Sequence, residues 1–417
     1  MPDLHPTKAQ AAMLSLAAGA LFDAPVQLPP DTDFEALFTA VREQALPGVL
    51  SEGLTSLQED AVPLAVMQRW QSHVVAILQK NAALLQAQSD LLSLCRERGI
   101  PALILKGFSA AVYYPVPDLR ACGDVDCLIP PQRLNELCLA LEEGGFEREP
   151  GLDEHHVAYH KDGVMLEIHF KVSGLPEGEV GELLQGKFFA DIFDKATEAQ
   201  VLGERFPVPA PHHQAMILLL HIAKHLQDGG VGLRQVLDLA LFAKHHQTVF
   251  DFDFIHLLRT CGLYRFTETL LLGCTRHLGL PTALVPWCLE GDSDLADALF
   301  ADFLTGGNFG RAEQTYAGSG MAHKGRRRGE SAFAAAVRGV CDMCRLEWPA
   351  CRKFPPLLLI LVPFWILRRL LDRSKPRVRP VKMLRSAEAR ATLYDELAFF
   401  APDAPKDGAS IDKTQFQ

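Results

Sequence analysis

The stretch Leu105-Lys106-Gly107 is followed, 16 residues after the glycine, by Gly123-Asp124-Val125-Asp126. Side chains at i and i+2 of a strand project from the same face, so the carboxylates of Asp124 and Asp126 are expected to point together. Such close like charges need a counter-ion, and Mg²⁺ prefers oxygen ligands that it shares with substrate phosphates. The pattern therefore predicts a strand that holds a metal-bound triphosphate, with Gly107 letting the backbone approach the phosphates.

The sequence around these motifs predicts a small unit of helices and strands. Apolar spacing indicates helices over 81–98 and 132–144. Short apolar or alternating runs predict four strands, at 101–107, 124–129, 155–160 and 164–172. The last two strands are joined by Asp162-Gly163, which favours a hairpin turn. We therefore expect an α+β fold, in which a small core with a mixed sheet is flanked by helical domains.

A third carboxylate suited to the same site is Glu167, in the sequence Met165-Leu-Glu-Ile-His169. Strand alternation puts Glu167 and His169 on one face, while Leu166 and Ile168 face the core. We expect Asp124 and Asp126 to bind two Mg²⁺ ions. We expect Glu167 to bind the catalytic ion and to help deprotonate the group that attacks the triphosphate. These three residues are the predicted catalytic and metal-binding set.

These residues resemble a known family. Leu105-Lys-Gly107, the pair Tyr113-Tyr114, Arg120, Gly123-Asp-x-Asp126 and the later Glu167-x-His169 are similar to the bacterial uncharacterised nucleotidyltransferase family, within the superfamily of DNA polymerase beta-like nucleotidyltransferases. The resemblance is strongest over residues 100–240. It implies a catalytic Asp-x-Asp, a third acidic residue on a neighbouring strand, a glycine turn before the triphosphate and a helical domain behind the site. The wider superfamily usually has Gly-Ser or Gly-Gly at this turn. Here Gly107 is instead followed by Phe108 and only then by Ser109.

Several further residues are expected to contact the nucleotide. Lys106 and Arg120 can bind phosphate as a point charge and as a bidentate partner, and Gly107 and Ser109 lie in the turn. The resemblance extends to His221-x-x-Lys-His225 and Leu233-Arg-Gln-x-x-Asp238, and it places Lys224 and Arg234 near phosphates. The alternatives are a solvated helix face for the first motif and an ion pair within the helix for Arg234 and Asp238.

The predicted reaction is transfer of a nucleoside monophosphate from a nucleoside triphosphate such as ATP to an unknown acceptor. The alternative is a catalytically inactive protein that binds nucleotide or associates peripherally with a membrane. Four histidines, His155, His156, His160 and His169, also suggest zinc. Because no His-Glu-x-x-His helix is present, structural or substrate-facing roles are favoured over a zinc site.

Composition and the positions of proline and glycine clusters suggest four regions in a chain of 417 residues. They are an N-terminal helical region over 1–80, the nucleotidyltransferase core over 81–205, a helical domain over 206–305 and a basic C-terminal helical region over 306–417. The ten cysteines are scattered in apolar contexts, which is typical of reduced thiols. We therefore expect no disulfides and a cytoplasmic protein, or one peripheral to the inner face of the membrane.

The C-terminal region is basic and contains the most apolar stretch, 354–371. Between Lys324 and Arg390, 17 Lys and Arg stand against 5 Asp and Glu, although the whole chain has a net charge of −10. Only 14 residues separate the basic flanks of the apolar stretch, and prolines interrupt it, so it is too short to span a bilayer. An anionic membrane surface bound through 352–379 is one expectation, and a helix buried against the catalytic domain is the other; nucleic acid is less favoured. Cys341, Cys344 and Cys351 are expected to be core cysteines rather than metal ligands.

Overall fold

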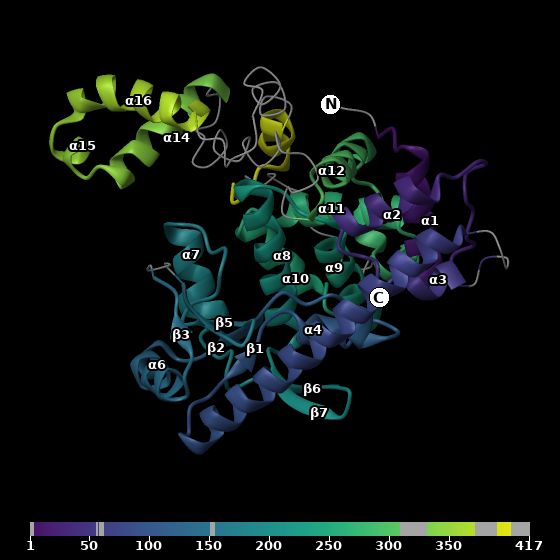
Figure 1. The fold of residues 1–417 in the computed structure, drawn as a ribbon, viewed down its shortest axis with the longest axis horizontal. Helices are drawn as coiled ribbons and strands as arrows, with labels where there is room; N and C mark the ends of the chain where they lie inside the picture. Colours follow the sequence, from purple (N-terminus) through teal and green to yellow (C-terminus); the bar gives the residue numbers. More distant parts are fainter. Residues whose placement is uncertain are drawn as a thin grey trace.

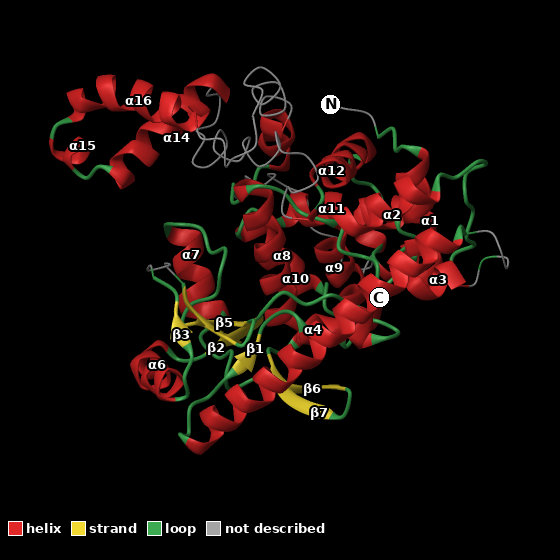
Figure 2. Ribbon diagram, in the orientation of Figure 1, coloured by secondary structure: helices red, strands yellow, loops and turns green. Residues whose placement is uncertain are grey.

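The computed structural model describes residues 4–55, 57, 62–150, 155–308, 332–371 and 390–401. Within these ranges a five-stranded mixed sheet lies among helices, and a separate two-stranded hairpin stands beside it (Figures 1 and 2). The α+β fold expected from the sequence is confirmed.

Among the described residues, helices and strands are mixed between Leu103 and Val208, and the segments before and after are helical. The N-terminal helices are α1 (Lys8–Phe22), α2 (Phe34–Glu43), α3 (Ser51–Thr55) and α4 (Leu64–Glu97). The mixed core contains β1 (Leu103–Ile104), α5 (Phe108–Ala111), β2 (Val125–Leu128), α6 (Leu134–Glu143), β3 (Glu147–Arg148), β4 (His156–Lys161), β5 (Val164–His169), α7 (Glu179–Leu183), β6 (Thr197–Val201) and β7 (Glu204–Val208). The remaining helices are α8 (Pro211–Asp228), α9 (Leu233–His245), α10 (Phe252–Thr260), α11 (Tyr264–His277), α12 (Ser293–Gly306), α14 (Ala332–Glu347), α15 (Ala350–Lys353) and α16 (Leu358–Leu371).

The sheet has the strand order β1-β2-β5-β4-β3, and among the residues that the structure describes its one parallel pair is β2 with β5. In that pair Asp126 stands opposite Glu167. Leu166 and Ile168 are fully buried on the other face, as strand alternation predicted. The β4–β5 turn has positive φ at both Asp162 and Gly163, which suits the right-handed twist of a two-residue hairpin.

The strands differ from the expectation in three places. The strand expected over 101–107 is reduced to Leu103–Ile104, because the chain turns at Gly107 and enters α5. Strand β3 and the β6–β7 hairpin were not expected. Both residues of β3 are exposed, so β3 lacks the apolar alternation that identifies a half-buried strand. The hairpin does have this pattern, because Val201, Phe206 and Val208 are buried between more exposed residues, but the runs are short and Pro207 indicates a boundary.

Two groups of helices hold the sheet in place. Helix α4 runs unbroken from Leu64 to Glu97, and its C-terminal half packs against β2, β5 and β7 (Figure 1). Helices α8 and α9 pack together on the other side of the site, and nearly every residue of α9 is buried. Their apolar side chains belong to one large core that also includes α1, α2, α11 and α12, while the sheet, α4 and α6 form a second core.

A buried ion pair joins the sheet unit to α9. Arg120, in the loop before β2, donates from Nε to Asp238 Oδ1 at 3.0 Å, and its Nη2 donates to Oδ2. The two side chains are 3% and 5% exposed. Tyr114 donates its hydroxyl to the same carboxylate at 2.8 Å. Asp238 therefore fixes the β2 loop against the helical domain.

Helices α14 and α16 pack against each other, with the Cys344 thiol 3.9 Å from the carbonyl oxygen of Leu361. The expectation of a helix buried on the catalytic domain is wrong for α16, because Leu359 and Ile360 are 81% and 70% exposed. Among the described residues, no helix combines the length and the apolar character needed to cross a membrane. All ten cysteines are free thiols. Cys344 and Cys351 are buried, as expected of core cysteines, whereas Cys341 is only partly buried.

We expect Asp238→Ala to lower the free energy of unfolding by about 3 to 5 kcal/mol, because it leaves the buried Arg120 guanidinium uncompensated. Chemical denaturation of the full chain measures this loss. Glu396→Ala is the matched control, since it breaks the Arg265–Glu396 pair, whose side chains are 44% and 47% exposed. The control should lose less than about 1 kcal/mol. Similar losses in both variants would contradict the structural role of Asp238.

Candidate functional site

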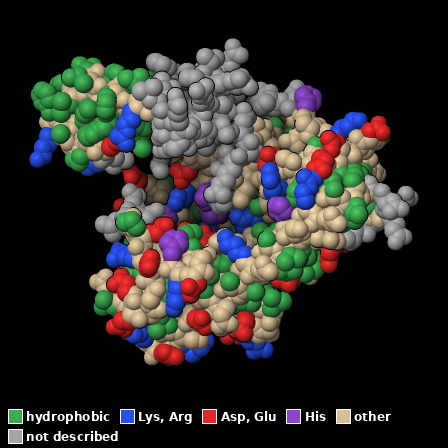
Figure 3. Space-filling view, viewed as in Figure 1, with side chains coloured by type: hydrophobic (Ala, Val, Ile, Leu, Met, Phe, Trp, Pro, Cys, Tyr) green, Lys and Arg blue, Asp and Glu red, His purple; other side chains and the backbone are tan. Residues whose placement is uncertain are grey.

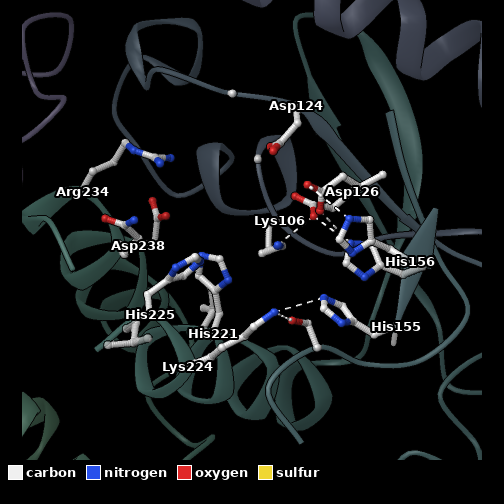
Figure 4. Close-up of a pocket in the computed structure, with 18 of the residues that line it drawn as sticks. Lys106, Asp124, Asp126, His155, His156, His221, Lys224, His225, Arg234 and Asp238 are labelled. Carbon is white, nitrogen blue, oxygen red and sulfur yellow. Dashed lines mark hydrogen bonds and ion pairs between the residues drawn. The ribbon is translucent and has the colours of Figure 1, made fainter. Parts of the chain in front are cut away.

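A pocket of about 220 Å³ lies between the β2–β5–β4 part of the sheet and helices α8 and α9. Figure 3 shows a hollow there in which basic, acidic and histidine side chains meet. Figure 4 shows Asp124 and Asp126 toward the sheet, with Lys106, His155 and His156 near Asp126. The side chains of α8 and α9 lie across from them: His221, Lys224, His225, Arg234 and Asp238. The lining residues are Lys106, Gly107, Arg120, Gly123, Asp124, Asp126, His155, His156, Glu167, His169, Ser173, Leu218, His221, Ile222, Lys224, His225, Arg234, Gln235 and Asp238.

The acidic wall consists of Asp124, Asp126 and Glu167, the three carboxylates predicted from the sequence. Asp126 and Glu167 stand opposite each other on the parallel strands β2 and β5. Asp124 lies directly before β2, and its carboxylate lines the same pocket. The sheet register therefore places Asp126 next to Glu167, which lies on a different strand and far from it in the sequence.

Asp126 is the centre of the charge network. Lys106 Nζ lies 2.7 Å from Asp126 Oδ1, and His169 Nε2 lies 2.9 Å from the same oxygen. Burial alone raises the pKa of Asp126, but Lys106 and His169 outweigh it and hold that pKa well below its usual range. Asp126 is therefore a buried carboxylate that stays ionised.

Asp124 has the opposite electrostatic character. Burial, and after it the charge of Asp126, raises the pKa of Asp124 to about 6. The charges of Lys106 and Arg234 lower this pKa, but they only partly offset the rise. Asp124 is therefore the member of the set that gains most from a bound cation.

The loop that carries Asp124 is positioned by a residue that the sequence reading did not identify. Asn81 of α4 is 2% exposed, and its amide nitrogen donates to the carbonyl oxygens of Asp118 and Arg120 at 2.7 and 2.9 Å. Its amide oxygen accepts from the Cys122 N–H at 3.0 Å. The only signal in the sequence was a polar residue on the apolar face of a predicted helix, which by itself does not indicate what it binds.

Gly107 supplies the tight turn expected at the phosphate side of the pocket. Its φ of +63° lies in the region that favours glycine, and a Cβ there would lie 3.5 Å from the carbonyl oxygen of Asp124. Because Gly107 lines the pocket, a ligand can approach this backbone closely.

The opposite wall carries the cations Lys224 and Arg234. Lys224 Nζ lies 3.2 Å from His155 Nε2 and donates to Ser173 Oγ at 3.2 Å. Arg234 is 9% exposed and donates from Nη1 to the Ala121 carbonyl oxygen, but its buried Nε has no hydrogen-bond partner among the described residues. Burial, and after it the nearby Arg120, lowers the pKa of Arg234. An anion in the pocket would relieve this cost.

His221 and His225 lie on the same wall, with ring centroids 4.3 Å apart. Burial and the charge of Lys106 lower the pKa of His225 to about 3, and the same two causes lower that of His221. Both imidazoles are therefore neutral, so the positive charge on this wall comes from Lys224 and Arg234. The alternative of a solvated helix face does not hold for this motif.

Two of the expected nucleotide-binding residues make other contacts instead. Ser109 is 1% exposed, donates to the Leu105 carbonyl oxygen at 2.8 Å and is absent from the pocket lining. Arg120 lines the pocket, but its Nε and Nη2 groups are engaged by Asp238, so the expected bidentate phosphate contact is replaced by a structural ion pair. The ion pair within α9 that was expected as an alternative for Arg234 and Asp238 is also replaced by this one.

Three of the four histidines considered in the sequence meet at the sheet end of the pocket. His155 and His156 stand at the start of β4, and His156 pairs across the hairpin with His169 of β5. Their rings lie 4.7 to 5.6 Å apart, centroid to centroid. His160 is separate and interacts with Glu149 at 2.6 Å.

The donor groups present suit a divalent metal. Three carboxylates supply the hard oxygen ligands that Mg²⁺ prefers. The cations on the opposite wall suit a ligand that carries negative charge. Asp126, Glu167 and His169 also place possible ligand atoms within 4.8 Å of one another.

Comparison with known proteins identifies the family of the chain. No curated protein matches the chain. A protein family described as uncharacterised nucleotidyltransferase matches residues 30–279, from just before α2 to just after α11. This range is more than half of the chain and includes every residue of the acidic and basic walls. The chain therefore belongs to the uncharacterised nucleotidyltransferase family.

Proposed function

We propose that the protein transfers a nucleoside monophosphate from a nucleoside triphosphate to an acceptor hydroxyl or phosphate, and that Asp124, Asp126 and Glu167 hold Mg²⁺ for this reaction. The observation that carries the proposal is the pocket itself, in which three carboxylates on the sheet face Lys224 and Arg234 on the helices. A metal-bound triphosphate has both the cation and the anion that these two walls require.

The chemistry balances without a redox partner. An acceptor oxygen forms a bond to the α-phosphorus as the bond from that phosphorus to the pyrophosphate oxygen breaks, and the acceptor proton leaves to a base. Glu167 is the proposed base, because it lies on the acidic wall and is 19% exposed at its side chain. Mg²⁺ bound to the carboxylates would stabilise the charge that develops on the entering and leaving oxygens.

The protein's own residues supply binding and orientation. Arg234 would pair with phosphate oxygens through its unpartnered Nε edge, and Lys224 would add a point charge. Lys106 would compensate the clustered carboxylates and then contact the triphosphate. The backbone at Gly107 would approach the phosphates.

The first experiment measures release of labelled pyrophosphate from each of the four nucleoside triphosphates with Mg²⁺, using cell extract as the acceptor source. Asp124→Ala/Asp126→Ala should reduce the rate at least about 100-fold, because it removes the groups proposed to bind the metal and its triphosphate. The matched control is Asp90→Ala/Asp253→Ala, which removes two exposed carboxylates outside the pocket. Equal background release by wild type and the pocket variant, with both folded, would refute the enzyme and favour an inactive nucleotide-binding protein.

Arg234→Met should weaken nucleoside triphosphate binding about tenfold or more, because it removes a charge-assisted contact to phosphate. Arg234→Lys should recover only part of the affinity, since an ammonium lacks the planar guanidinium edge. Titration calorimetry with a triphosphate and with the corresponding nucleoside separates the phosphate contribution. Loss of equal affinity for the nucleoside would show that Arg234 does not act on phosphate.

A membrane surface is a second candidate partner, supported by the exposed apolar side chains of α16. Leu359, Ile360 and Phe364 are 52 to 81% exposed, and Figure 3 shows hydrophobic side chains gathered over α14 and α16. Arg352 and Lys353 stand before this segment and Arg368 near its end. We propose that 352–379, part of which lies outside the described residues, docks on an anionic bilayer by burying these side chains while the basic groups meet lipid headgroups.

Vesicles with and without phosphatidylserine test this docking. Leu359→Glu/Ile360→Glu should weaken binding of the full chain at least about tenfold, because two side chains lose the free energy of burial in the bilayer. Leu64→Glu/Leu139→Glu is the matched control, since Leu64 and Leu139 are 72% and 61% exposed on α4 and α6. Binding that is unchanged by the α16 substitutions, or absent with wild type, would remove the membrane as a partner.

A further inference from the structure

The histidines beside the acidic wall were expected to be structural or substrate-facing, yet the structure gathers them with possible metal ligands. One ring nitrogen from each of His155, His156 and His169 lies within 4.8 Å of the others. His169 also belongs to the group that it forms with Asp126 and Glu167. Five side chains with nitrogen or carboxylate ligands therefore form one continuous cluster with His169 at its centre.

The spacing of the ligand atoms fits a single ion. His169 Nε2 lies 2.9 Å from Asp126 Oδ1 and 3.3 Å from Glu167 Oε2. Two ligands that bind one ion at about 2.1 Å lie roughly 3.0 to 3.4 Å from each other. His156 Nε2, at 3.8 Å from Glu167 Oε1, borders the same space.

We infer that the position bordered by Asp126, Glu167 and His169 binds a divalent transition metal, Mn²⁺ or Zn²⁺, with His155 or His156 completing its ligands. Imidazole is a good ligand for the borderline transition metals, whereas Mg²⁺ favours an all-oxygen environment. This inference deepens the proposed function by naming the ion at one of its two metal positions, and its catalytic meaning rests on that function. Asp124, which is not part of the histidine cluster, is left to the Mg²⁺ that accompanies the triphosphate.

Two lysines border the cluster, and they set the condition for metal binding. Lys106 Nζ lies 2.7 Å from Asp126 Oδ1, and Lys224 Nζ lies 3.2 Å from His155 Nε2. A bound divalent ion would repel both ammonium groups. Each stands on a flexible stem and lines the pocket, so each can turn toward triphosphate oxygens instead. Metal and triphosphate are therefore expected to bind more tightly together than separately.

Metal binding can be measured without catalysis. The full chain is stripped with a chelator and dialysed against Mn²⁺ or Zn²⁺ in the presence of excess Mg²⁺, and bound metal is determined by mass spectrometry. We expect one transition ion per chain. His155→Ala/His156→Ala should raise its Kd at least about tenfold through lost ligands. His160→Ala/His212→Ala is the matched control, because it removes two half-exposed imidazoles outside the cluster and should leave the Kd unchanged.

Nitrogen ligation has its own readout. Electron paramagnetic resonance of the Mn²⁺-loaded wild type should show coupling to imidazole nitrogen. The inference is overturned if excess Mg²⁺ displaces all of the transition metal, if nitrogen coupling is absent, or if the His155/His156 variant binds as tightly as wild type. A protonated His169 that only donates to Asp126 would give this negative result.

The same proteins separate this inference from the proposed function. Asp124→Ala should keep the transition ion while pyrophosphate release is lost. Transition-metal binding in a protein that releases no pyrophosphate would support the site and refute the enzyme. Pyrophosphate release that needs Mg²⁺ alone, in a protein that binds no transition ion, would refute the site and leave the enzyme standing.

Discussion

The parallel pairing of β2 with β5 is the constraint on which the rest of the site depends. Its register puts Asp126 directly opposite Glu167, so two carboxylates share one face at the centre of a sheet. Asp126 is almost fully buried, and isolated charge in such a position is costly. Lys106 and His169 offset this cost by contacting the Asp126 carboxylate, and the helices across the pocket add further positive charge. The remaining fold can be understood as the support that keeps these compensating groups in place.

That support comes from segments far apart in the sequence. Asn81 of α4 holds the loop before β2 by its backbone, and Asp238 of α9 holds the same loop through Arg120. Both contacts are buried and both are satisfied on the protein side. A loop fixed from two directions can present Asp124 with little freedom, which is what a preorganised metal and phosphate site requires.

The sequence could predict which carboxylates meet in the pocket, because their placement follows from local pattern. Alternation along β5 predicted that Glu167 lies on the polar face of its strand. The Asp-x-Asp spacing predicted that Asp124 and Asp126 point the same way. Lys224 and Arg234 were placed near phosphates from a resemblance, and the pocket does bring them opposite the carboxylates. Ser109 and Arg120 show the limit of local reasoning. A buried hydroxyl and a buried guanidinium bind whatever the tertiary structure puts beside them, here the Leu105 carbonyl and Asp238, and neither partner could be known from spacing alone.

The histidines illustrate the same limit from the opposite direction. In the sequence His155, His156 and His169 lack the His-Glu-x-x-His spacing, which places two ligands on one face of a helix. A β-hairpin brings distant residues together by cross-strand pairing instead, and His156 opposite His169 is such a pair. The two-residue turn at Asp162 and Gly163, which the sequence predicts, fixes this register through the positive φ of both residues. A two-residue turn therefore decides whether imidazole nitrogens meet beside Asp126, so the turn contributes to the chemistry of a site that it does not touch.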